Sequence, residues 1–177
     1  MRAILSAFAA LSLLALPIAQ AQTRKPAPHA APAGGPRMLG KFEDWTAAIH
    51  QEAGQTVCYA FVRAQNSAPS VAGRGDVVLT VTERPTGRDA VAISAGFAFA
   101  PGAEVLVQVD RTGLHFYTAQ RNAFARDGAE AVATMMKGRE AIARLPGPRG
   151  TQVTDTFSLR GFAQAYAAIG KACPAAR

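Results

Sequence analysis

The chain has 177 residues, and 19 lysines and arginines against 12 aspartates and glutamates give it a formal net charge of +7. Two cysteines and three histidines do not supply the four closely spaced ligands of a structural metal module. Residues 38–119 carry six basic and eight acidic side chains, whereas residues 120–177 carry nine and four. A basic C-terminal third can attract anionic lipid head groups, polyanions or acidic proteins, although ordinary solubilising charge explains the same balance.

The N-terminus has the pattern of a signal peptide over residues 1–21. Arg2 precedes an uncharged apolar run, 3–16, and Ala19-Gln20-Ala21 places small residues at a cleavage site. The run is shorter than the roughly 20 apolar residues that a transmembrane helix needs. We therefore expect export, cleavage after Ala21 and no membrane span in the mature protein. Position 22 is not a cysteine, which disfavours a lipid anchor.

Residues 22–38 are expected to form a flexible linker. Four prolines and the pair Gly34-Gly35 leave too few apolar side chains to offset the entropy of an ordered chain. The folded domain is therefore expected to cover residues 39–177, which is a common size for one domain.

The middle of the chain is rich in strand-forming residues, and turns containing Gly or Pro separate the segments. Val105, Val107 and Val109 fall on one side of a predicted strand, and Trp45 lies in the expected first strand. Short strands at this spacing favour an antiparallel sandwich or barrel. The predicted strands are 41–49, 57–64, 76–83, 89–98, 104–110 and 114–118.

A short helix and a hairpin are predicted in the C-terminal third. Asp127 is a good N-cap for a helix over 128–137, and Gly138 is a good residue to end it. Residues 139–145 and 151–157 are expected to pair around a turn that contains two prolines and two glycines.

A last helix is expected to begin after Ser158, which is a good N-cap residue. Phe162, Tyr166, Ile169 and Cys173 are spaced by four, three and four, so they share one face of that helix.

The two cysteines, Cys58 and Cys173, admit three interpretations. A metal site lacks further ligands, and a catalytic thiol at Cys173 is disfavoured because only four residues follow it. An exported protein enters an oxidising compartment, so we expect a disulfide between Cys58 and Cys173.

Several short motifs resemble the invasion-associated locus B (IalB) family. These are Asp44-Trp45-Thr46, Val57-Cys58-Tyr59, Lys137-Gly138-Arg139, and Ser158-Leu159-Arg160-Gly161-Phe162, which a terminal cysteine follows. The resemblance implies a mainly β fold: an immunoglobulin-like antiparallel β-sandwich with a short helix and a C-terminal amphipathic helix. It implies an exported protein of the periplasm or cell envelope of a Gram-negative bacterium, with no catalytic residue and no cofactor to carry over. Some relatives have a further cysteine after the tryptophan, where this chain has Ala47 and Ala48.

Other candidate site residues have more ordinary interpretations. Arg74-Gly75-Asp76 matches the tripeptide that integrins bind, but so short a match arises easily by chance. His29 lies in the linker, and His115 lies near Asp110 with no nucleophile beside them. Trp45 and the pair Met135-Met136 are expected to fill the core. Six arginines can form a patch only if the fold gathers them: Arg121, Arg126, Arg139, Arg144, Arg149 and Arg160.

No hydrolase, P-loop or metalloprotease motif is present in the sequence. The sequence therefore predicts a non-enzymatic, periplasmic or cell-envelope binding module with no metal, no cofactor and no nucleic-acid partner. Its expected partner is an envelope protein or an anionic envelope component. The alternatives are a secreted factor that acts on host cells and, more weakly, an envelope hydrolase without a recognisable motif.

Overall fold

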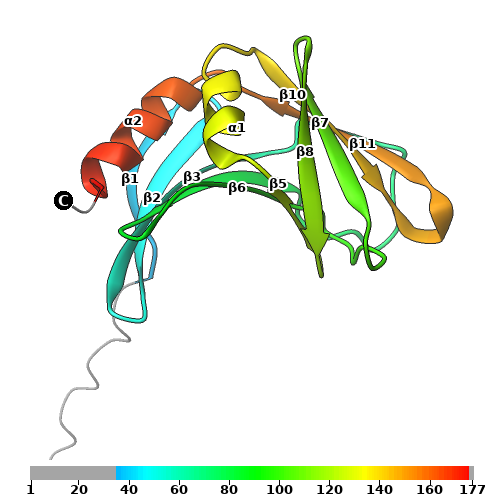
Figure 1. Cartoon of the computed structure of the whole chain (residues 1–177), viewed down its shortest axis with the longest axis horizontal. Helices are drawn as coiled ribbons and strands as arrows, with labels where there is room; N and C mark the ends of the chain where they lie inside the picture. The colour runs from blue at the N-terminus through cyan, green and yellow to red at the C-terminus, as the bar shows by residue number, and fades with distance from the viewer. Residues whose placement is uncertain (1–34, 176–177) are drawn as a thin grey trace, which may run out of the picture. The chain divides into compact units, whose positions relative to one another are not determined.

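The computed structural model describes residues 35–175 and contains one antiparallel sheet of eleven strands with two helices (Figure 1). The predicted signal peptide and most of the predicted linker lie outside these residues. The strands are β1 (Arg37–Phe42), β2 (Trp45–Glu52), β3 (Gln55–Arg63), β4 (Asn66–Ala68), β5 (Val78–Arg84), β6 (Gly87–Ser94), β7 (Glu104–Val109), β8 (Thr112–Ala119), β9 (Asn122–Ala125), β10 (Glu140–Pro146) and β11 (Gln152–Ser158). The helices are α1 (Gly128–Met135) and α2 (Phe162–Ala172), and Pro148–Gly150 forms a 3-10 turn.

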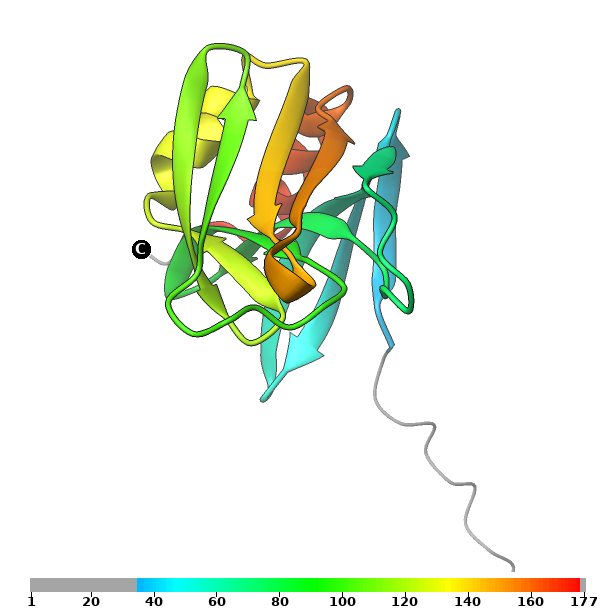
Figure 2. The same ribbon diagram turned by 90° about the vertical axis from the view of Figure 1, so that its right-hand side faces the viewer.

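The sheet bends back on itself into two layers (Figures 1 and 2). Its strand order is β1-β2-β3-β5-β6-β9-β8-β7-β10-β11-β4. The first layer contains β1, β2, β3, β5 and β6, and the second contains β9, β8, β7, β10, β11 and β4. The short strand β9 joins the layers because it pairs with β6 on one side and β8 on the other. On the opposite side, the chain passes from β3 to β4, and the Gln65 amide donates to the Thr156 carbonyl at 2.8 Å. The expectation of a mainly β, antiparallel fold is confirmed.

The core lies between the layers because apolar residues alternate along each strand. In β7, Val105, Val107 and Val109 are each 1 % exposed and face inward, as the spacing predicted. In β5, Leu79 and Val81 occupy the same inward positions and are fully buried. Burying such side chains contributes about 1.5–3 kcal/mol each relative to leaving them exposed.

Both helices pack on the inner side of the first layer, next to the second layer (Figure 1). The short helix begins where predicted: the Asp127 carboxylate accepts from the Glu130 amide at 2.8 Å. The longer helix lies across β1, β2 and β3, and its buried residues are Phe162, Ala165 and Ile169. The predicted hairpin is present as β10 and β11.

Several predicted boundaries differ from the structure. The strand expected over 89–98 is Gly87–Ser94, and β1 begins at Arg37, inside the expected linker. Residues 41–49 are not one strand: Glu43 has φ +49°, and the turn there divides the segment into the hairpin β1–β2. Ser158 does not cap α2, because it is the last residue of β11 and pairs with Glu140. Its hydroxyl accepts instead from the Arg160 amide, and Gly161 occupies the N-cap position.

Candidate functional site

The family-like motifs meet where α2 begins. The Trp45 side chain is fully buried, and its Nε1 donates to the Ser158 carbonyl at 2.9 Å. Its ring lies 4.8 Å from the ring of Phe162, the first residue of α2. Arg160 pairs with Glu43 in the β1–β2 turn at 2.8 Å. These residues therefore join the first hairpin to the last helix, which is a structural role.

Gly161 in this junction has a backbone that other residues adopt only with strain. Its φ is +84°, and a Cβ there would collide with the Phe42 carbonyl. Gly138 is similarly enclosed, because its Cβ would meet Val109 and Leu159. Two of the motif glycines are thus explained by close packing.

We expect Gly161→Ala to lower the free energy of unfolding by about 2 kcal/mol or more, because strain and a backbone collision act together. Gly170→Ala, in the same helix, is the matched control. A Cβ at Gly170 meets nothing within 4 Å, so it should stabilise the protein by about 0.5–1 kcal/mol. Urea unfolding of both variants measures these changes, and a loss of equal size for both would contradict the assignment.

The two cysteines are bonded to each other. Cys58 on β3 and Cys173 at the end of α2 form a disulfide whose Cα atoms are 5.9 Å apart. Cys58 is 0 % and Cys173 is 5 % exposed, so the bond lies within the core. Neither cysteine is free, and the pair fastens the end of the chain to the first layer.

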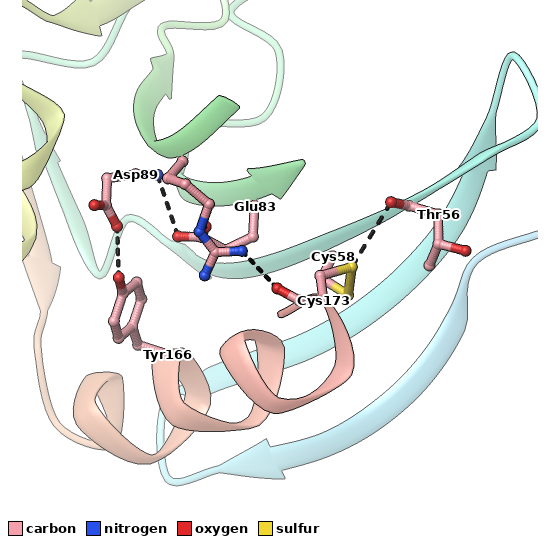
Figure 3. A network of polar contacts seen from close by, with 7 residues as sticks. Thr56, Cys58, Glu83, Asp89, Tyr166 and Cys173 are labelled. Atoms are coloured by element: carbon pink, nitrogen blue, oxygen red, sulfur yellow. Dashed lines mark hydrogen bonds and ion pairs between the residues drawn. A yellow bond between two sulfur atoms is a disulfide. The ribbon is translucent and has the colours of Figure 1, made fainter. Parts of the chain in front are cut away.

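A polar cluster lies beside this disulfide and contains the buried carboxyl of Glu83 (Figure 3). Glu83 pairs with Cys58 across β5 and β3, and its Oε1 accepts from the Asp89 amide at 3.2 Å. The Tyr166 hydroxyl donates to Asp89 Oδ1 at 2.5 Å. Arg88 contacts both ends of the cluster: its Nε lies 2.6 Å from Glu83 Oε2, and its Nη1 donates to the Cys173 carbonyl at 2.5 Å.

Burial raises the pKa of Glu83 to about 7. The hydrogen bond from the Asp89 amide and the charge of Arg88 oppose this rise, whereas the Asp89 side chain adds to it. Burial, with the hydrogen bond to Asp89, also raises the pKa of Tyr166. Glu83 Oε2 accepts no well-directed hydrogen bond although Arg88 Nε is near it. A carboxyl with these properties resembles a general acid, but at 0 % exposure it touches no substrate unless the cluster opens.

The tripeptide Arg74-Gly75-Asp76 is not displayed for recognition. Arg74 is a buried ion-pair partner whose guanidinium makes two parallel bonds to Asp155, at 2.8 and 2.6 Å. The two side chains are 7 % and 0 % exposed. Asp76 is exposed and pairs with Arg63 instead. An integrin therefore finds no accessible arginine here.

The other predicted candidates are dispersed. Asp110 and His115 line two different hollows next to α1, of about 220 and 290 Å³. Both hollows are smaller than the sites that take drug-sized ligands. Met135 is buried as expected, whereas Met136 is 45 % exposed. Among residues 35–175, no three His, Cys, Asp or Glu side chains gather as a metal site would require.

The six arginines do not gather into one free patch. Arg126 pairs with Glu104, and Arg160 pairs with Glu43. Arg121 donates to a backbone carbonyl. A salt-sensitive anion site formed by all six is therefore not present.

The side of the first layer that faces away from the helices continues onto β9 and β8, and this surface is here called the outer face. Strand register aligns one row of its side chains across six strands: Thr46, Phe61, Thr80, Ala92, Phe124 and Tyr117. A second row contains Ala48, Tyr59, Thr82 and Ala90. The rings of Tyr59 and Phe61 stack 6.0 Å apart, and those of Tyr117 and Phe124 stack 5.5 Å apart.

Two features of this surface distinguish it from the rest of the sheet. Its charged residues lie around the rows: Lys41 and Glu104 pair with Thr46 and Tyr117 at the two ends of the first row. Arg126 lies over the Tyr117 ring at 5.9 Å, and Arg63 and Arg84 continue the same side of β3 and β5. Both helices lie on the opposite side of the layer and leave it uncovered (Figure 1). No helix in the described part of the chain is long and apolar enough to cross a bilayer.

The fold, together with the contacts between the first hairpin and the last helix, defines a two-layer antiparallel β protein. A disulfide bonds the end of its C-terminal helix to the first layer. The family model described as invasion associated locus B (IalB) protein matches residues 45–170. The chain belongs to the IalB family. No curated protein sequence matches it.

The crystal structure of invasion associated protein b from Bartonella henselae is similar in fold. The two chains are 16 % identical, with a TM-score of 0.54, over 75 % of this chain and 95 % of that one. At this identity the likeness concerns the fold alone, and it confirms the expected immunoglobulin-like type of β architecture.

Sequence reasoning missed the polar cluster of Glu83, Arg88, Asp89 and Tyr166. A signal for it was present, because Leu79, Val81 and Glu83 share the period-2 face that buries β5. A carboxyl in phase with buried residues predicts a buried carboxyl, whereas its partners on β6 and α2 depend on the tertiary fold.

Proposed function

We propose that this protein is an exported, non-enzymatic binding module of the bacterial cell envelope and that its partner docks on the outer face. Membership of the IalB family supports the class of protein. The N-terminal sequence pattern supports export to the periplasm, because an apolar run is followed by small residues at a cleavage site.

One observation carries the assignment of the surface. The outer face combines stacked aromatic rings with threonine hydroxyls, and it bears no charge inside its two rows. Aromatic side chains supply large contact areas at low entropic cost, and interface centres are depleted of charge. The family-like motifs, by contrast, make contacts within the fold, such as those of Trp45 with Ser158 and Phe162.

A secreted factor acting on host cells is the alternative. Because the Arg74 side chain is buried, such a factor would not bind integrins through Arg74-Gly75-Asp76. Cell fractionation separates the two possibilities: we expect the protein in the periplasmic fraction with Gln22 as its N-terminal residue, and recovery from the medium would favour the alternative.

Site-specific photo-crosslinking in living cells tests the binding surface. A photoreactive phenylalanine at Phe61 should give a discrete crosslinked species, whereas the same group at Thr154, on the second layer, should not. Thr80→Glu introduces a charge next to Phe61 and should abolish the crosslink without unfolding the domain.

Salt provides a further distinction, because contacts to the uncharged rows of the outer face persist at high ionic strength. Capture at Phe61 that disappears with added salt would indicate an anionic component held elsewhere. Equal capture at both positions, or none at either, would contradict the proposal.

A further inference from the structure

The end of α2 is held by a guanidinium that it shares with a buried carboxyl. Arg88 bridges Glu83 Oε2 and the carbonyl of Cys173, and Cys173 is also one half of the disulfide. The carboxyl of Glu83 is fully buried, while Arg88 is about one-third exposed at 32 %. The cluster therefore connects the charge of the Glu83 carboxyl to the position of Cys173 at the end of α2.

The groups facing Glu83 come from three elements. From β6, Arg88 offers a positive charge, and Asp89 offers both its amide and a second carboxylate. From α2, Tyr166 donates its hydroxyl to Asp89. From β3, Cys58 lies opposite Glu83 in the strand pair. When Glu83 is ionised, its charge is thus paired with the guanidinium of Arg88 and repelled by the nearby carboxylate of Asp89, whose side chain accepts from Tyr166 instead.

Ionising Glu83 therefore opposes the closed arrangement. A buried carboxylate loses its hydration, and a like charge nearby adds repulsion. Water reaches the carboxylate once the last turn of α2 and Arg88 move away from β5. Such a movement also uncovers the disulfide, because Cys173 belongs to the same turn and is 5 % exposed when closed.

We propose that Glu83 and Arg88 form a pH-controlled latch over the disulfide: the end of α2 stays closed while Glu83 is neutral and opens when Glu83 ionises, which exposes Cys58–Cys173 to reductants. The latch goes beyond partner binding, and the outer face is not part of it.

The sign and size of the effect follow from proton linkage. The folded pKa of Glu83, about 7, lies above the value of 4.5 expected in water, so the closed state binds the proton more tightly. Between these two values, rising pH favours opening, and above the higher one the effect levels off. The population of the open state should rise about tenfold between pH 6 and pH 8.

The rate of disulfide reduction by tris(2-carboxyethyl)phosphine tests the latch. The phosphine supplies two electrons that break the S–S bond; water provides the two protons for the thiols and the oxygen of the phosphine oxide. We expect the native protein to be reduced about tenfold faster at pH 8 than at pH 6 after division by the Glu83→Gln rates. That variant keeps the shape of the side chain and cannot ionise, so it also corrects for the pH dependence of the reagent.

Two further variants make the result specific. Glu104→Gln removes an exposed carboxyl and should leave the wild-type profile unchanged. Asp89→Asn removes the repelling charge and should move the profile to lower pH. A wild-type profile parallel to that of Glu83→Gln would overturn the latch.

Low concentrations of urea separate local opening from global unfolding. Opening of one helical turn exposes little surface, so the reduction rate should hardly change up to about 1 M urea. A rate that rises in urea as steeply as the unfolding equilibrium would also overturn the proposal, because reduction would then require the unfolded chain.

Discussion

Replacing Cys58 and Cys173 together with alanine is expected to lower the free energy of unfolding by about 4–5 kcal/mol. The bond closes a loop over a sequence separation of 115 residues, and its removal restores that much chain entropy to the unfolded state. The closed loop contains the end of β3, all eight strands from β4 to β11 and both helices, so most of the domain is affected.

Urea unfolding of the oxidised protein, the reduced protein and the double-alanine variant measures this loss. The reduced protein and the variant should be destabilised by similar amounts, because loop entropy is common to both. A loss below about 1 kcal/mol would show that packing of α2 against Trp45, without the covalent bond, closes the fold.

Asp155→Ala is expected to cost about 3–5 kcal/mol. Asp155 lies on β11 in the second layer, and Arg74 approaches it from the segment that precedes β5 in the first layer. Removing the carboxylate leaves the guanidinium buried without a compensating charge, which costs more than the ion pair itself contributes. The remaining contacts of Arg74, with the Ala95 carbonyl and the ring of Phe97, do not neutralise it.

Asp76, two residues after Arg74, supplies the control for Asp155→Ala. Asp76→Ala breaks the exposed pair with Arg63 and should change the free energy of unfolding by less than about 1 kcal/mol. The double variant Arg74→Met with Asp155→Ala should recover part of the loss of Asp155→Ala, because no buried charge then remains. Equal effects of the two aspartate substitutions would contradict the burial of Arg74.

Local sequence pattern was sufficient wherever an element is decided by its own residues. The alternating valines of β7 and the cap at Asp127 were recognisable because burial period and capping are local properties. The pattern failed at Ser158, a good cap residue by type, because pairing with Glu140 extends β11 through it. It failed at residues 41–49 because a positive φ at Glu43 is not visible in composition.

The candidate sites show the same division. The sequence left open whether Arg74-Gly75-Asp76 is displayed, and only the approach of Asp155 from a distant strand makes its arginine a core residue. The outer face is formed by side chains that the register aligns across six strands, so it cannot be predicted from the sequence of any one strand. The cluster around Glu83 requires β6 and α2 to meet beside the disulfide.

Strand periodicity and turn residues were enough to predict a mainly β fold, and two cysteines in a chain with a signal-like N-terminus were enough to predict their bond. The resemblance to the IalB family came from the short motifs. Which charges are buried, and which surface the helices leave open, depends on the tertiary structure. Burial depends on contacts between segments that are far apart in the chain, and a buried carboxyl has a different pKa from an exposed one although the residue is the same.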